Sequence, residues 1–285
     1  MSSENLPTVV YSSESPLRHP VKLVREIFAD IWRSRELTMI LFTRDLKAQY
    51  RQSVLGYVWI FIPILGTTLI WMFLNSSKVI QVAETPIPYP AFVLVGTMIW
   101  TVFTASLNQP LASFNAGKSV FMKLKVPPEA FIMAGLSKIV FDTTLRLLVL
   151  IPVFFILKIV PPWTAILFPI GLLCTMLIGV SIGLLILPLG SLYTDVARIV
   201  GMAVGFGMYL TPVVYPPPRG GWAGMLIDWN PMTAVVITVR DWLTLGNSQY
   251  CEVMVVVSLL AAFALLIAII IFRVVLPRLV ERMGM

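Results

Sequence analysis

The chain has 285 residues, of which 58% are hydrophobic and only 12% are charged. Its mean hydropathy of +0.89 is far above that of soluble globular proteins. A helix needs about 20 apolar residues to cross a membrane, so the chain has room for roughly six spanning helices and for no soluble catalytic domain. The net charge of +7 does not indicate nucleic-acid binding, because the basic residues lie beside apolar segments.

The chain begins with a polar segment and an amphipathic one. Residues 1–20 are rich in Ser, Pro and Glu and lack the pattern of a cleavable signal, which predicts a disordered tail. From 21 to 35 the apolar residues fall on one helical face, which predicts a helix lying on the cytoplasmic membrane surface. A linker would follow, so that helix and linker together occupy 21–53. Packing of this helix on a soluble partner protein is the alternative.

Six apolar runs follow, and they predict an all-α polytopic membrane protein. The transmembrane domain would occupy residues 54–273, and 274–285 would form a cytoplasmic tail. Boundaries of this kind are approximate. The predicted spans are about 54–74, 89–111, 131–156, 163–189, 199–215 and 253–272.

Two of the connections carry information. The segment 112–129 is polar and basic and ends at Pro127 and Pro128, which predicts a loop on the cytoplasmic side. The segment 216–252 is apolar but is broken by several prolines and glycines, so we expect short re-entrant or surface-lying helices there rather than a seventh span.

The distribution of basic residues predicts the orientation. With both termini in the cytoplasm, most of the 21 Lys and Arg fall in inside segments. Only four would lie outside, and this bias favours the stated orientation. These four are Lys78, Lys158, Arg219 and Arg240.

No pattern in the sequence indicates catalysis. The triplet Gly117-Lys118-Ser119 lacks the glycine that a phosphate-binding loop requires five positions before its own. The acidic residues are scattered singly and the only histidine is His19, so no metal site is expected. We therefore expect a non-catalytic chain without a cofactor of its own.

Three charged residues lie inside the third predicted span. Lys138, Asp142 and Arg146 recur every four residues, which places them on one helix face. Unpaired charge inside a bilayer costs at least about 2.5 kcal/mol per residue, so this stripe should face protein or water, with Asp142 neutralising a neighbouring cation. A structural contact with another helix is the favoured interpretation. Contact with an anionic substrate is the alternative.

Small and aromatic residues indicate further contacts. Gly179 and Gly183, like Gly201 and Gly205, have the four-residue spacing of closely packed helices, including those at dimer seams. Aromatic residues are typical of the membrane interface, and they also suit stacking against sugar rings. The candidates for lining a channel are Trp59, Phe61, Trp71, Phe103, Tyr209 and Tyr215.

The segment from Arg44 to Trp59, RDLKAQYRQSVLGYVW, with Pro63 after it, resembles the start of span one in ABC permeases that export O-antigen, capsular polysaccharide and teichoic acid. The segment 126–129 is similar to the part that follows the coupling helix in these permeases. The segments 211–216 and 230–231 resemble their region before span six. This resemblance covers the chain from about residue 21 onward.

The resemblance implies a homodimer in the inner membrane that docks two copies of a separate ABC ATPase, which bind ATP and Mg. The dimer would form a channel for a glycan linked to a polyprenyl diphosphate. The residues implied to contact the ATPase are Arg44, Asp45, Arg51, Gln52, Asn115, Lys118, Lys123 and Lys125.

Three other functions compete with this one. An ABC permease for a drug or a lipid would share the same fold. A membrane-embedded prenyl-phosphate sugar transferase would need clustered acids for a metal, and none are present. A secondary transporter would be expected to show a repeated half, and none is found.

Overall fold

Every regular element that the computed structural model describes is helical, which confirms an all-α protein. The predicted tail and most of the predicted interfacial helix lie outside the described residues. The part of this predicted helix that is described, residues 29–33, is helical. Gln52, Lys123, Lys125 and Arg219 lie outside them too. The described ranges are 29–51, 53–80, 82–121, 126–218 and 220–283.

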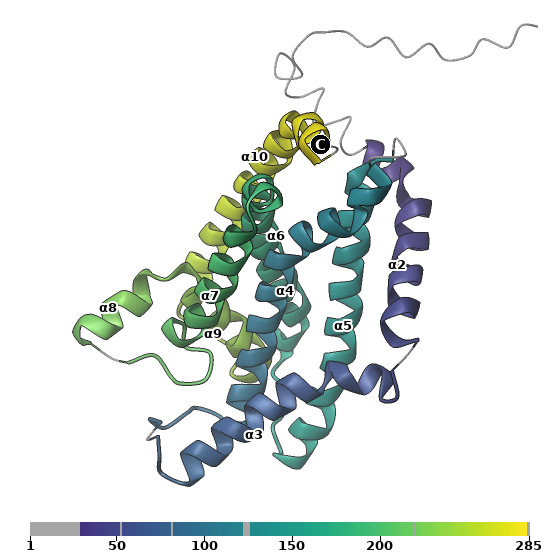
Figure 1. Cartoon of the computed structure of the whole chain (residues 1–285). Helices are drawn as coiled ribbons and strands as arrows, with labels where there is room; N and C mark the ends of the chain where they lie inside the picture. The colour runs from purple at the N-terminus through teal and green to yellow at the C-terminus, as the bar shows by residue number, and fades with distance from the viewer. Residues whose placement is uncertain (1–28, 52, 81, 122–125, 219, 284–285) are drawn as a thin grey trace, which may run out of the picture.

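The helices form a bundle in which α4, α5, α6 and α10 run along a common direction, while α3 lies across one end (Figure 1). The C-terminus is at the other end, where α4 finishes and α5 begins. The elements are α2 (Arg35–Tyr50), η2 (Gly56–Ile60), α3 (Ile62–Ser76), α4 (Tyr89–Phe121), α5 (Pro128–Ile156), η3 (Trp163–Leu167), α6 (Phe168–Leu192), α7 (Thr194–Leu210), α8 (Gly221–Trp229), α9 (Pro231–Thr244) and α10 (Cys251–Met283).

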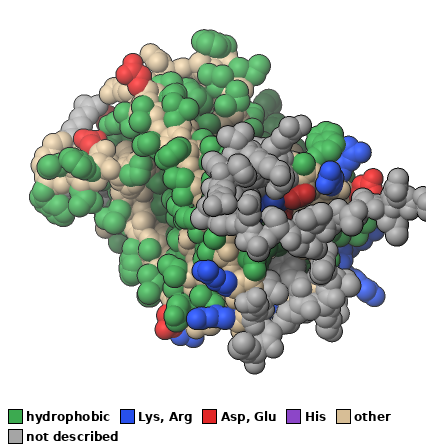
Figure 2. All heavy atoms as spheres, turned by 90° about the horizontal axis from the view of Figure 1, so that it is seen from above, with side chains coloured by type: hydrophobic (Ala, Val, Ile, Leu, Met, Phe, Trp, Pro, Cys, Tyr) green, Lys and Arg blue, Asp and Glu red, His purple; other side chains and the backbone are tan. Residues whose placement is uncertain are grey.

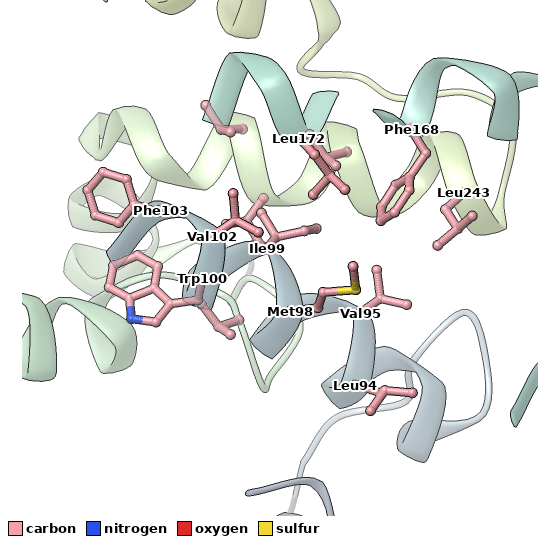
Figure 3. Packing of buried hydrophobic residues seen from close by; sticks show 14 of the residues in the cluster. Leu94, Val95, Met98, Ile99, Trp100, Val102, Phe103, Phe168, Leu172 and Leu243 are labelled. Atoms are coloured by element: carbon pink, nitrogen blue, oxygen red, sulfur yellow. The ribbon is translucent and has the colours of Figure 1, made fainter. Parts of the chain in front are cut away.

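The centre of the bundle is α4. All ten residues from Ala91 to Trp100 are buried, as expected of a helix surrounded by others. Figure 3 shows side chains of this helix packing against Phe168 and Leu172 of α6 and against Leu243 of α9. This part of α4 therefore has neighbours on all sides.

Close approach of α4 and α6 depends on glycine. A Cβ atom built at Gly183 would lie 2.3 Å from the carbonyl oxygen of Leu107, and one at Gly179 would lie 2.7 Å from that of Phe103. Nothing lies within 4 Å of the equivalent positions at Gly201 and Gly205 of α7. The first glycine pair therefore packs inside the chain, whereas the second faces open space.

Within the described ranges, four helices are long and apolar enough to cross a membrane. Two of the six predicted spans fall short: α3 has 15 residues and α7 has 17, whereas about 20 cross the hydrocarbon core upright. The four candidate spans are Tyr89–Lys118, Pro128–Ile156, Trp163–Leu192 and Cys251–Leu279.

Two helices extend beyond their predicted ends. The predicted loop from residue 112 is helical as far as Phe121, and the predicted tail after residue 273 is helical as far as Met283. Tertiary packing explains both corrections, because Phe114 meets Phe272 edge-to-face at 6.0 Å and Leu279 is buried in the same cluster.

Two other boundaries also differ from the prediction. The predicted linker after residue 35 is the helix α2, because buried Leu41 packs against Ala130, Phe131 and Ala134 at the start of α5. The fifth predicted span begins five residues early, at Thr194, and α7 ends at Leu210. Residues 211–214, which follow α7, are buried but not helical.

Candidate functional site

The end of the bundle that carries the C-terminus is held by one arginine and two acids. Arg273 of α10 donates through Nε to Glu129 Oε1 at 3.1 Å, and it also forms an ion pair with Asp30. The Arg273 side chain is 18% exposed and that of Glu129 is 12% exposed. This triad connects the N-terminal helical segment, the first turn of α5 and α10, and the sequence alone did not reveal it.

The residues expected to contact an ATPase fall into two groups in the structure. Asn115 and Lys118 lie in the last turns of α4, beside the triad's end of the bundle. Arg44, Asp45 and Arg51 lie on or just after α2, whose far end is at Tyr50.

The second group lies well away from the first. The α2 residue Phe42 already packs against Phe141 of α5, and Tyr57, just beyond α2, packs against the same ring. Phe141 is 13 residues into α5, or about 20 Å from its start. Arg51 therefore lies alongside a candidate span and not beside Lys118.

Side chains at this end are distributed unevenly. Figure 2 views it from above: the Lys and Arg side chains that can be seen lie toward the right and the lower middle, whereas hydrophobic side chains cover much of the left. The described basic residues of this end include Lys118, Arg198, Arg278 and Arg282.

The triplet Gly117-Lys118-Ser119 lies inside α4. Its backbone N–H groups belong to the helix and cannot cradle a phosphate as a loop does. No group of three potential metal ligands was found among the described residues.

The charged stripe of α5 faces α2, where it lies close to Tyr50. Asp142 forms an ion pair with neither Lys138 nor Arg146. Its Oδ1 atom is buried without a hydrogen-bond partner in the described part of the chain, as is the hydroxyl of Tyr50 on α2. One polar atom of the stripe and one of α2 are therefore buried without a hydrogen-bond partner in this part of the protein.

A buried arginine organises the opposite end. Arg240 is 3% exposed, and its Nη1 donates to the carbonyl oxygens of Pro212 at 3.1 Å and Val213 at 3.3 Å. Its guanidinium lies 3.7 Å from the centroid of the Phe92 ring, a cation–π contact. Burial lowers the pKa of Arg240 to about 10, so it remains charged at neutral pH. It ties the chain after α7 to α4 and α9.

The helix that carries Arg240 has clear sequence signals at both ends. Asn230 caps α9, accepting a hydrogen bond from the Met232 N–H, and Pro231 is its first residue. Gly246, with φ of +95°, ends it. Asn230 also donates to Thr211 Oγ1 at 2.8 Å. The two segments whose resemblance was noted, 211–216 and 230–231, thus meet in space.

Burial also changes the carboxyl group that follows. It raises the pKa of Asp241 to about 6, although the Arg240 charge and a hydrogen bond from Ser248 oppose this rise. The sequence analysis named Arg240 only as one of the four basic residues predicted to lie outside the cytoplasm. Its role depends on the Phe92 ring and on loop carbonyls far away in the chain.

The aromatic candidates do not converge on one surface. Phe103 is buried and stacks on Trp100, with centroids 5.2 Å apart, so in this chain it belongs to the core. Trp59 and Tyr209 are exposed. Tyr215 donates its hydroxyl to the Tyr209 carbonyl at 2.7 Å. Trp71 packs against the core, and Phe61 is half-buried.

Comparison with known proteins identifies relatives over most of the chain. It is 26% identical to the O-antigen export system permease protein RfbA of Klebsiella pneumoniae, over 75% of this chain and 83% of the relative. For RfbA of Myxococcus xanthus the identity is 24%, over 77% and 83%. For the polysialic acid transport protein KpsM of Escherichia coli it is 22%, over 70% and 78%. The profile of the ABC-2 type transporter family matches residues 36–244. The chain therefore belongs to the ABC-2 type transporter family.

Proposed function

We propose that this chain is the permease subunit of an ATP-driven exporter that moves lipid-linked polysaccharide across the cytoplasmic membrane. The observation that carries the proposal is the similarity, over at least 70% of the chain, to proteins named as permeases for O-antigen and polysialic acid. The chain itself performs no chemistry in this proposal. Two copies of a separate ABC ATPase bind ATP and Mg and supply the energy.

The triad's end of the bundle is the proposed ATPase docking surface. In this proposal both termini lie in the cytoplasm, which the basic residues at this end of the bundle support. Asn115, Lys118, Lys123 and Lys125 would contact the ATPase. Because Glu129 is bonded to Arg273, a displacement of the segment before α5 would also reach α10.

A second copy of the chain would pack against α7. Among the described residues of this helix none is buried, and its apolar side chains Ile199, Met202 and Phe206 are exposed. The open space over Gly201 and Gly205 permits close approach of another helix. In the dimer, α3 and α7 would serve as spans one and five, because bilayer thinning and packing against neighbouring helices accommodate short spans, and this completes six spans. The glycan would pass through the channel so formed, in contact with exposed aromatics such as Trp59 and Tyr209.

The test is export in a strain that lacks the native permease. The chain would be expressed with its cognate ATPase, and surface polysaccharide would be measured by antibody binding. Restored export that requires an intact ATPase supports the proposal. If the chain exports a drug or a lipid and not the glycan, the assignment of polysaccharide as its cargo is wrong. Hydrolysis of ATP by the purified chain alone would refute its role as a passive subunit.

A further inference from the structure

The second half of α4 has one polar side. Between residues 101 and 116, one continuous sector of about 120° around the helix axis contains only threonine, asparagine and alanine. Its polar side chains are exposed or half-buried, and they extend for about 21 Å along the helix. We call these four residues the polar face of α4: Thr101, Thr104, Asn108 and Asn115.

The other sides of this part of α4 are covered by neighbouring helices. Gly135 of α5 lies against Gln109 and Ser113, and Gly190 of α6 lies against Leu111. The polar face is the side that these two helices leave open.

The exposed side of α10 has a different composition. From residue 253 to 271, every exposed side chain of this helix is a valine, leucine, isoleucine or phenylalanine, as expected of a helix surface that lies in lipid. Between residues 101 and 116 of α4, by contrast, the exposed side chains are Asn108, Ala112, Asn115 and Ala116. The polar face of α4 is therefore not suited to contact with lipid.

This face lies at the depth of the hydrocarbon. The candidate span Tyr89–Lys118 has 30 residues, with Thr104 at its middle. Asn108 is about 6 Å further along the helix, and so lies inside a hydrocarbon layer about 30 Å thick. Its amide makes one hydrogen bond with a described residue, from Nδ2 to the Thr104 carbonyl oxygen at 2.8 Å. An amide in this layer needs further partners, which lipid cannot supply.

Water suits this face better than a second protein helix does. Thr101 and Thr104 already donate their hydroxyl protons to backbone oxygens of α4, at 2.7 Å and 3.1 Å. The helix that is open to a second copy, α7, exposes the apolar side chains of Met202 and Phe206, which cannot bond to Asn108. Water can, and polar side chains within a membrane span typically face a water-filled cavity.

We propose that the polar face of α4 is one wall of a water-filled passage that opens at the triad's end of the bundle, where Asn115 and Lys118 lie. From residue 89 to 117 this helix carries no Asp, Glu, Lys or Arg. The wall therefore offers hydrogen bonds and no ion pair, which suits an uncharged, hydroxyl-bearing chain and gives a phosphate no fixed binding point. That this chain is a glycan rests on the proposed function, whereas the contact of the face with water does not.

The reaction of cysteines with a membrane-impermeant reagent tests the contact with water. Thr104→Cys and Asn108→Cys are made separately in a full-length chain whose native Cys174 and Cys251 are replaced by alanine. The chain is expressed with its cognate ATPase, and membrane vesicles are opened by freezing and thawing so that the reagent reaches both faces. A charged methanethiosulfonate is added, and mass spectrometry follows the modified fraction over time. The reagent attacks through the thiolate, which forms in water and not in an apolar environment.

Phe263→Cys is the matched control. Phe263 is exposed and lies two residues, about 3 Å, from the middle of the candidate span Cys251–Leu279. A rise of one unit in the pKa of a thiol reduces its thiolate about tenfold at pH 7, so the two α4 variants should react at least about tenfold faster than the Phe263→Cys variant. Equal rates would overturn the inference.

Two other outcomes would also overturn it. Val102→Cys replaces a buried residue of the same helix, and a reaction as fast as that of Asn108→Cys would mean that this part of α4 has no covered side. If an oxidant joins two copies of the Asn108→Cys variant by a disulfide while the thiosulfonate does not react, the face is a helix contact and not the wall of a passage.

Glycan export separates this inference from the proposed function. Asn108→Leu should reduce export several-fold, whereas Asn108→Gln should not, because glutamine keeps the amide. If the cysteines react but the chain and its ATPase export no glycan, the proposed function fails and the passage stands. If export proceeds and neither cysteine reacts, only this inference fails.

Discussion

The contact of α4 with α6 makes a quantitative prediction at Gly183. An added Cβ atom would lie 2.3 Å from the Leu107 carbonyl oxygen and 3.1 Å from Pro110 Cγ. The first obstacle is backbone, which cannot rotate away, so the two helices must move apart by about 1 Å to reach an ordinary contact. Overpacking of this kind costs about 1–3 kcal/mol. Replacing glycine in a helix returns up to about 1 kcal/mol, so Gly183→Ala should destabilise the fold by about 1–2 kcal/mol.

The measurement is the free energy of unfolding from SDS titration of the purified chain in mixed micelles, followed by circular dichroism. Gly66→Ala is the matched control, because Gly66 is also a helical glycine, in α3, but has nothing within 4 Å of its Cβ position. It should be neutral or stabilising by up to about 1 kcal/mol. If the two alanine variants unfold alike, the helices do not approach each other as the structure shows.

The remaining predictions concern the two ends of the bundle. Arg240→Met leaves two loop carbonyls without their donor and should destabilise the fold by about 2–4 kcal/mol, measured by the same titration. Burial raises the pKa of Asp241 to about 6, so ionisation favours the unfolded chain: stability should fall as pH rises from about 4 to 6, by at most about 3 kcal/mol, and Asp241→Asn should abolish this fall. Arg273→Gln and Glu129→Gln should each destabilise by about 1–3 kcal/mol and be non-additive when combined.

Each of these predictions has a result that contradicts it. For Arg240, a Lys variant as unstable as the Met variant would show that the charge contributes nothing. A stability profile that rises between pH 4 and 6 would reverse the sign deduced for Asp241. Strict additivity at Arg273 and Glu129 would mean that the two side chains do not interact in solution.

Composition and hydropathy were sufficient to predict the fold class and the positions of several helices. The all-α class, the positions of α5 and α6, and the short helices after α7 followed from apolar runs and from prolines and glycines, because these signals are local. The segments that resemble polysaccharide permeases, such as 44–59, predicted the family that the ABC-2 profile match over 36–244 showed.

The lengths of α4 and α10 could not be predicted from local signals. Both helices continue through polar sequence because Phe114, Phe272 and Leu279 pack together across more than 150 residues of chain. Likewise, the two glycine pairs have the same spacing in sequence, and only Gly179 and Gly183 have a neighbour to approach.

Sequence by itself determined that this chain is a helical membrane protein, since both properties follow from residue types counted along short segments. The tertiary structure alone decided which charges are partnered. Arg240 meets Phe92 and Arg273 meets Glu129 across distances in sequence that no periodicity encodes. Arg51 remains without a partner among the described residues for the same reason: the fold places α2 against α5 by its apolar side and leaves its cations facing outward.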